Sequence, residues 1–301
     1  MTGRKPGATA PGFSFYGIGR LPGDSYGTIK KYMRVQQEGQ CMEQNFVVYY
    51  TEEEKREEAE TLAAHLGIAV AGTEEERREA DMVLRLDEEG LSLTGDGLNL
   101  RGDFRRMLPR LKHNNLSHES VVKAAKLKDY DGIPLVVDAT AGMGEDSLLL
   151  AAAGYRVHMY EYNPVIAALL GDTLKRAAAD PELSEIVERM QLHEGDSVKA
   201  LREMAERLEA GEDEIRPDLI LLDPMFPGRK KSSLVKKKLQ LIQHLEQPCE
   251  DEAAMVDAAL SVKPRRVMIK RPVKGPFLAD RKPSYSITGK NIRYDCLIPQ
   301  S

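Results

Sequence analysis

From residue 135 onward, short apolar runs alternate with longer segments of helical character. The apolar runs lie at residues 135–139, 156–161, 190–194, 219–223 and 265–270. Strands that alternate with helices in this way form βα units, whose parallel sheet is covered on both faces. The pattern predicts an open, mostly parallel α/β sheet over residues 135–301, which segments 285–288 and 292–298 finish as a hairpin.

Residues 42–105 show a different pattern, in which short strands dominate. Strands are predicted at residues 46–50, 68–71, 82–86, 91–94 and 98–100. After the first of them, Thr51 and Glu54 form a capping-box pattern at the start of a Glu-rich helix that ends near Gly67. We therefore expect a small α+β domain before the larger sheet.

Two further segments complete the predicted organisation. Residues 1–41 are rich in Gly, Pro and Tyr without a sustained period, so we expect a poorly ordered extension there. Residues 106–134 are predicted to form a basic connector, followed by a helix from about residue 117 to residue 128. The predicted fold class is thus α/β, a Rossmann-like sheet preceded by a small α+β domain.

Composition narrows the class of protein. The chain has 301 residues, of which 30% are charged and 42% hydrophobic, as is typical of a soluble globular protein. No apolar run approaches the roughly 18 residues of a membrane span, and residues 1–23 lack the apolar segment of a secretory signal. The three cysteines, Cys41, Cys249 and Cys296, lie far apart and form no C-x-x-C pair. We expect a cytoplasmic protein with neither a disulfide framework nor a metal site.

Acids and glycines follow the predicted strands of the larger sheet. In open α/β sheets, ligands bind beyond the carboxyl ends of the strands. The residues at or just past these ends are Asp138, Gly142, Gly144, Glu161, Asp196 and Asp223. Glycines let the main chain approach a ligand, and Glu161 is placed to accept both hydroxyls of a ribose. Asp196, with Ser197 beside it, is placed to accept from an adenine amino group.

The charge of the glycine turn distinguishes between two adenine-containing cofactors. A dinucleotide site has a third glycine where this chain has Ser147, and Glu145 and Asp146 would repel a pyrophosphate. The same acids, together with Asp138, suit a cationic sulfonium with a free amino group. The sequence therefore favours S-adenosyl-L-methionine over NAD.

The stretch from Asp223 to Phe226 ends the apolar run 219–222 and suggests a substrate. The carboxylate of Asp223 and the main-chain carbonyl of Pro224 can each accept an N–H of an exocyclic base amine, while Phe226 stacks on the ring. Such an amine is a weak nucleophile that gains from being positioned and hydrogen-bonded. The stretch predicts a methyltransferase that acts on a nucleobase, with Asp223, Pro224 and Phe226 as catalytic residues.

Basic residues follow the same stretch, although the formal charge of the chain is −5. For a nucleic-acid partner the distribution of charge matters more than its sum. We predict that RNA phosphates contact Lys230, Lys231, Lys236 and Lys237 after the Asp-Pro turn, and Lys270 and Arg271 at the end of a later strand.

Several of these motifs together resemble the ribosomal RNA small subunit methyltransferase J family. The matching stretches are residues 137–144 with Asp146, 161–165, 167–170, 222–227, 231–232, 234–237 and 270–272. The resemblance covers roughly residues 117–298. Two departures are the segment 113–119, where the family has a Gly-rich, Arg-containing stretch, and Glu145, where it usually has Arg.

The resemblance implies methylation of a guanine N2 amine in small-subunit ribosomal RNA, either free or within the small ribosomal subunit. It implies S-adenosylmethionine as donor, with contacts from Glu145, Asp146, Glu161, Tyr162, Asp196, Ser197 and Asp223. Two alternatives remain. One is an N6-adenine methyltransferase, since D-P-P-[YF] turns serve adenine amines, although Met225 replaces the second proline. The other is a non-catalytic RNA-binding module with a nucleotide site.

Overall fold

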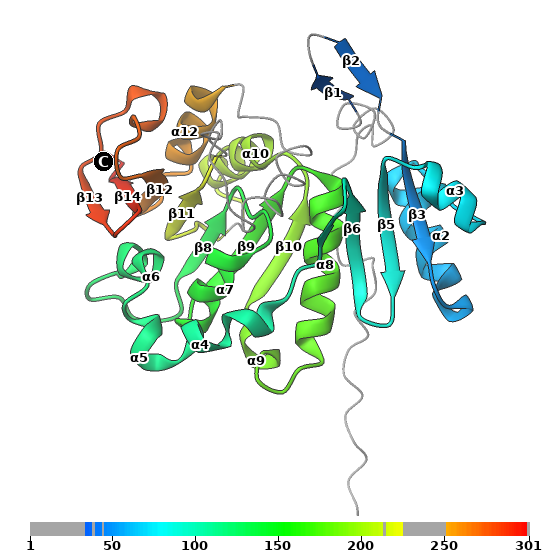
Figure 1. Cartoon of the computed structure of the whole chain (residues 1–301). Helices are drawn as coiled ribbons and strands as arrows, with labels where there is room; N and C mark the ends of the chain where they lie inside the picture. Colours follow the sequence, from blue (N-terminus) through cyan, green and yellow to red (C-terminus); the bar gives the residue numbers. More distant parts are fainter. Residues whose placement is uncertain (1–33, 38–39, 44, 213–214, 225–250, 300–301) are drawn as a thin grey trace, which may run out of the picture.

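The structure, a computed structural model, describes residues 34–37, 40–43, 45–212, 215–224 and 251–299. Figure 1 shows a large central sheet with helices on both faces and a smaller sheet beside helix α8. No helix within these ranges is long and apolar enough to cross a membrane.

The large sheet is formed by the predicted apolar runs. Its strands are β8 (Leu135–Asp138), β9 (Arg156–Glu161), β10 (Met190–Glu194), β11 (Leu219–Leu222), β12 (Arg266–Pro272), β13 (Tyr285–Thr288) and β14 (Ile292–Leu297). They lie in the order β10-β9-β8-β11-β12-β14-β13. The strands from β10 to β12 are parallel, and β14 is antiparallel to both of its neighbours. The strand order reverses between β8 and β11, which is where such sheets bind ligands.

Helices bury the two faces of this sheet because alternate strand residues point to opposite sides. One face packs against α6 (Ser120–Ala125), α7 (Glu145–Ala152), α8 (Pro164–Ala178) and α9 (Ser184–Val187). The other face packs against α10 (Ser197–Glu209) and α12 (Glu252–Ser261), and the turn η4 (Leu278–Asp280) adds Leu278. The predicted α/β fold is therefore confirmed.

The small sheet has the order β4-β3-β5-β6-β7. Its elements are β3 (Phe46–Tyr50), η2 (Glu53–Lys55), α2 (Arg56–Leu66), β4 (Ala69–Val70), α3 (Glu74–Glu79), β5 (Met82–Asp87), β6 (Gly90–Gly95) and β7 (Leu98–Leu100). A separate ribbon of β1 (Arg34–Gln37) and β2 (Gln40–Glu43) lies mostly within the segment predicted to be poorly ordered.

The predicted capping box at Thr51 is wrong. Residues 53–55 form a 3-10 turn, so α2 begins only at Arg56, and the Thr51 hydroxyl donates to Glu52 instead. A capping box does form at Thr73, whose side chain accepts from the main chain of Glu76 at the start of α3.

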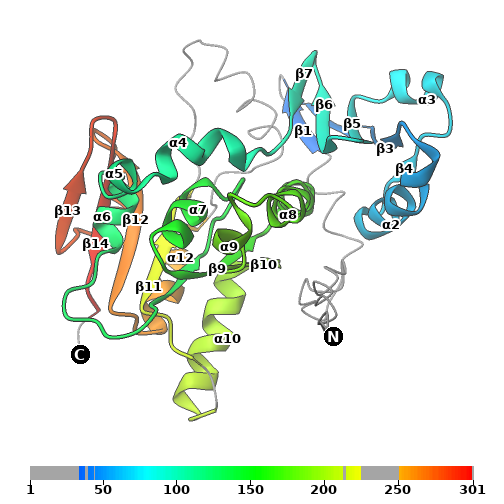
Figure 2. The ribbon, with the colours of Figure 1, turned by 90° about the horizontal axis from the view of Figure 1, so that it is seen from below.

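The connector crosses from the small sheet to α6 along one side of the molecule (Figure 2). It consists of η3 (Phe104–Met107), α4 (Leu108–Leu111) and α5 (His113–Leu116). The helix predicted from about residue 117 to 128 is the shorter α6, because Glu119 and Lys126, which flank it, both have extended or non-helical backbone angles.

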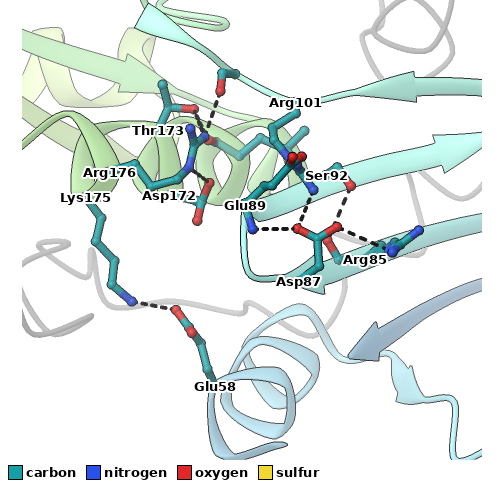
Figure 3. A network of polar contacts seen from close by, with 12 residues as sticks. Glu58, Arg85, Asp87, Glu89, Ser92, Arg101, Asp172, Thr173, Lys175 and Arg176 are labelled. Atoms are coloured by element: carbon teal, nitrogen blue, oxygen red, sulfur yellow. Dashed lines mark hydrogen bonds and ion pairs between the residues drawn. The ribbon is translucent and has the colours of Figure 1, made fainter. Parts of the chain in front are cut away.

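Helix α8 joins the two sheets. Its residues Ile166 and Leu169 share a buried cluster with Val48 and Leu84 of the small sheet. Figure 3 shows a polar network around the same junction, in which Lys175 of α8 pairs with Glu58 of α2 at 2.6 Å. In addition, Arg176 of α8 donates to Asp172 and to the carbonyl of Gly102, and Arg101 pairs with Asp87 and Glu89. The small sheet is thus fixed to the large one by apolar packing and by charge.

Replacement of a buried side chain of α8 by alanine at this junction should destabilise the fold. Because Leu169 is fully buried between the two sheets, we expect Leu169→Ala to lower the free energy of unfolding by roughly 2–5 kcal/mol. Denaturant unfolding followed by circular dichroism measures this. Ile133→Ala, at a largely exposed aliphatic residue, serves as the control with an expected change under about 1 kcal/mol. A similar loss in both variants would contradict the shared core.

Candidate active site

Charged side chains from separate strands meet at the carboxyl edge of the large sheet. Asp138 ends β8, Glu161 ends β9, and Asp223 directly follows β11. Lys270 lies near the end of β12, and Asp146 lies in the first turn of α7. All lie at the carboxyl ends of parallel strands around the point where the strand order reverses, which is where ligands bind in such sheets.

The glycine turn between β8 and α7 uses its two glycines differently. Both have positive φ angles, +54° at Gly142 and +75° at Gly144. A Cβ added to Gly142 would meet nothing within 4 Å, whereas one added to Gly144 would lie 2.8 Å from Cδ1 of Leu170 and 3.3 Å from Cζ of Phe104. Gly142 therefore borders open space beside the acids, and Gly144 lets α7 pack closely against α8 and η3.

Glu161 is a buried carboxylate fixed by the main chain. Its Oε2 accepts from the Gly142 N–H and its Oε1 from the Asn163 N–H, both at 2.8 Å. Burial raises the pKa of Glu161 to about 7, although these two hydrogen bonds oppose the shift. The Tyr162 main chain also donates to this carboxylate, so the group is firmly oriented and keeps acceptor capacity for a ligand hydroxyl.

Asp138 is buried more deeply and supports the turn. The Ser147 hydroxyl donates to its Oδ2 at 2.6 Å and the Thr140 N–H to its Oδ1 at 3.2 Å. Burial raises its pKa to about 7. The Thr140 hydroxyl in turn accepts from the Asp223 N–H at 2.6 Å, which links β8 to the end of β11.

Lys270 lies between two acids. Its Nζ is 2.8 Å from Oδ2 of Asp146 and 2.8 Å from Oδ2 of Asp223. The hydroxyl of Tyr294, a buried residue of β14, donates to the same Asp146 oxygen at 2.9 Å. Lys270, for which the sequence predicts a contact with RNA phosphates, thus forms a double ion pair inside the candidate site.

The predicted phosphate contact of Arg271 is wrong, because this residue is only 2% exposed. Its side chain points to the other face of β12 from Lys270, where its Nε donates to the carbonyl of Pro276 at 2.9 Å. The remaining predicted phosphate ligands, Lys230, Lys231, Lys236 and Lys237, lie outside the described residues, as does Phe226.

The other predicted cofactor residues lie around this edge. Asp196 caps α10 by accepting from the N–H groups of Val198 and Lys199, and Ser197 after it is buried. Tyr162 is 46% exposed beside Glu161. The Glu145 side chain is 65% exposed and lies 4.0 Å from the guanidinium of Arg110.

Sequence reasoning missed the residues that hold the acids in place. These are Thr140, Ser147 and Tyr294, together with the position of Lys270 between the carboxylates. Only one feature of the sequence indicated the position of Lys270, which is that it ends a predicted strand. Because parallel strands have their carboxyl ends at the same edge of a sheet, Lys270 could have been expected near the acids. Within the described ranges, no group of His, Cys, Asp and Glu is arranged to hold a metal ion.

Comparison with known proteins shows the family to which this chain belongs. Residues 68–299 match the family described as "Putative SAM-dependent methyltransferase". The chain belongs to this S-adenosylmethionine-dependent methyltransferase family. It also belongs with the proteins named ribosomal RNA small subunit methyltransferase J. The one from Thioalkalivibrio sulfidiphilus is 40% identical over 257 residues, which cover 83% of this chain and 96% of the relative.

Two further comparisons support the same family. The ribosomal RNA small subunit methyltransferase J of Pseudomonas aeruginosa strain UCBPP-PA14 is 38% identical over 246 residues, covering 79% of this chain and 89% of the relative. A crystal structure of a SAM-dependent methyltransferase from Neisseria gonorrhoeae superposes with a TM-score of 0.63 at 27% identity, covering 84% of this chain and 96% of that one. The predicted cofactor, S-adenosylmethionine, is therefore confirmed for this methyltransferase.

The residues of this methyltransferase fit that cofactor. The open space beside Gly142 leaves room for a ligand, and the oriented Glu161 carboxylate suits the hydroxyls of its ribose. The acids Asp146 and Asp223 suit its positive charge.

The two glycines should respond differently to substitution by alanine. Gly142→Ala should lower the free energy of unfolding by about 1–2 kcal/mol for the left-handed backbone, and should also weaken cofactor binding. Gly144→Ala adds overpacking against Leu170, so we expect a loss of about 2–5 kcal/mol. Denaturant unfolding and isothermal titration calorimetry measure the two effects. Equal stability losses would rule out the assigned packing role of Gly144.

Cofactor affinity should fall as the pH drops below about 7, the raised pKa of Glu161. Below that pH the group binds a proton and loses the carboxylate that accepts from the ribose. If one carboxylate is required, affinity should fall about tenfold per pH unit well below the pKa. Calorimetry at several pH values between 5.5 and 8 measures this.

Glu161→Gln is the matched control for this pH dependence, since the titration of the ligand itself is common to both proteins. The variant should bind more weakly at pH 8 and show a shallower dependence, whose remaining slope reports on Asp138. Identical slopes in the two proteins would exclude Glu161 from cofactor binding.

Proposed function

We propose that this methyltransferase modifies the exocyclic N2 amine of a guanine in small-subunit ribosomal RNA, and that it works in the cytoplasm. The RNA class follows from the names of its relatives, which cover most of the chain. The observation that carries the amine substrate is the position of Asp223 and Pro224 directly after β11, beside the point where the strand order reverses.

Among the described residues, the Asp223 carboxylate has a partner for one of its two oxygens. Its Oδ2 pairs with Lys270, while Oδ1 has no hydrogen-bond partner within the part of the chain that the structure describes. The side chain is 36% exposed, so a substrate can reach it. An amine N–H donated to Oδ1, and a second donated to the Pro224 carbonyl, would fix the nitrogen in one orientation.

Orientation is the main help that such an amine needs, because its lone pair is delocalised into the ring. S-adenosylmethionine supplies a methyl group on a sulfonium, and transfer to an amine leaves a neutral thioether and one proton to be lost from the nitrogen. Asp223 stabilises the positive charge that develops on the nitrogen and can accept this proton before solvent does.

The RNA must present its base outside the helix stack. Exocyclic amines inside folded RNA are covered by neighbouring bases, so the guanine has to be splayed out to reach Asp223. We propose that Phe226 stacks on the base, and that Lys230, Lys231, Lys236 and Lys237 contact phosphates close to it in the sequence. An N6-adenine amine remains the second candidate, since Asp-Pro turns also serve that group.

Loss of the Asp223 carboxylate should abolish transfer. We expect Asp223→Ala to lower kcat by at least about 100-fold, the usual effect of removing a group that stabilises transition-state charge. Labelled S-adenosylmethionine, small ribosomal subunits and naked ribosomal RNA provide the assay, followed by nucleoside analysis. The expected product is N2-methylguanosine, whereas N6-methyladenosine would identify the second candidate.

The matched control is Asp257→Ala, which removes an exposed acid of α12 that pairs with Arg281. It causes the same change in net charge and should leave kcat within about twofold of wild type. Full activity of Asp223→Ala would exclude Asp223 from the reaction.

A further inference from the structure

Lys270 brings an ammonium group among several carboxylates that lie at one edge of the sheet. It reaches Asp146 of α7 and Asp223 after β11, each at 2.8 Å. Its side chain is 25% exposed, and those of its two partners are 18% and 36% exposed. An ion pair in such partial burial keeps more of its strength than a pair on the open surface.

Contacts from several secondary-structure elements hold this cluster of Lys270, Asp146 and Asp223 in place. Lys270 and Tyr294 are direct partners in the antiparallel pairing of β12 and β14, so their side chains lie on the same face. Both donate to Oδ2 of Asp146, and Lys270 also reaches Oδ2 of Asp223. The main chain of Asp223 is held in addition by Thr140 of the turn after β8.

This arrangement determines which oxygen of Asp223 is available. An ammonium on Oδ2 hinders rotation of the carboxylate and leaves Oδ1 for a different donor. It also offsets the repulsion between Asp146 and Asp223, which would otherwise favour protonation of one of them.

We propose that Lys270 is a positioning residue for methyl transfer, which holds Asp223 as an oriented carboxylate and is itself held by Asp146 and Tyr294. The inference rests on the proposed role of Asp223, and it assigns Lys270 to the chemistry rather than to RNA phosphates. Lys270 acts through Asp223 and need not touch the substrate.

The charges around Asp223 agree with this role. Burial raises the pKa of Asp223, Lys270 lowers it, Asp146 raises it and Arg271 lowers it, with the net pKa above the ordinary value. Asp138 also faces it from β8. Burial lowers the pKa of the Lys270 ammonium, but Asp146 and Asp223 outweigh that effect and raise this pKa overall. Lys270 therefore stays charged at neutral pH.

Removal of the ammonium should move the pH profile of the enzyme. Without Lys270 the carboxyl group of Asp223 binds its proton more tightly, so the acid limb of kcat/KM shifts to higher pH. We expect Lys270→Met to lower kcat by about 100-fold at neutral pH, with partial recovery at pH 9. Affinity for S-adenosylmethionine should be unchanged or higher, because the donor is cationic and the acids lose their counter-ion.

Two further variants separate positioning from folding. Lys270→Gln keeps a hydrogen-bond donor without the charge and should show the same shift of the acid limb, even if Lys270→Met fails to fold. Lys270→Arg restores the charge, and its acid limb should return to the wild-type pH. Lys263→Met, at an exposed lysine beyond the opposite end of β12, is the control for net charge.

The outcomes distinguish this inference from the proposed function. If wild-type protein transfers methyl to RNA, and both neutral variants keep its kcat and its acid limb, the role of Lys270 is overturned while the function holds. Parallel loss of cofactor binding and of activity, with no shift of the acid limb, would also overturn it. Absence of transfer by the wild-type protein would instead refute the proposed function.

Discussion

The structure depends on how the buried and half-buried carboxylates at the carboxyl edge of the large sheet are compensated. An ionised carboxylate removed from water is costly unless it is hydrogen-bonded or paired. The acids are compensated in different ways. Glu161 accepts hydrogen bonds from the main-chain N–H groups of Gly142 and Asn163, and Asp138 accepts from a hydroxyl and an N–H. Asp146 and Asp223 share one ammonium, that of Lys270. The compensation is partial, since burial still raises the pKa of both Asp138 and Glu161 to about 7.

These interactions also fold the site. The hydrogen bond from Gly142 to Glu161 joins the turn after β8 to the end of β9, and the bond from Asp223 to Thr140 joins the same turn to β11. Gly144 lets α7 approach α8, and α8 carries the small sheet on its other side. The acids are therefore oriented by the packing of the whole chain.

Much of this arrangement was predictable from the sequence because it depends on periodicity and strand ends. Apolar runs located the strands, and the acids at their ends located the candidate site. The prediction failed where the outcome depends on contacts distant in sequence. Thr51 does not cap a helix, because residues 53–55 form a 3-10 turn. Lys270 pairs with Asp146, which lies 124 residues away in the sequence. Arg271, the next residue, is buried on the opposite face because strand neighbours alternate. Adjacent basic residues therefore have unrelated contacts.

The position of Lys270 also constrains where RNA can be held. A phosphate contact requires an exposed cation that can pair with the RNA phosphates and displace their counter-ions. If Lys270 turned toward a phosphate, Asp146 and Asp223 would face each other without a counter-ion, beside the site of a cationic donor. The phosphate contacts are better supplied by lysines outside this cluster, and those that follow Asp223 in the sequence are the nearest along the chain. On the proposed function, the acids and Lys270 then orient the amine and the methyl donor while other lysines hold the phosphates, so different parts of the protein would meet the two opposite charge requirements of the reaction.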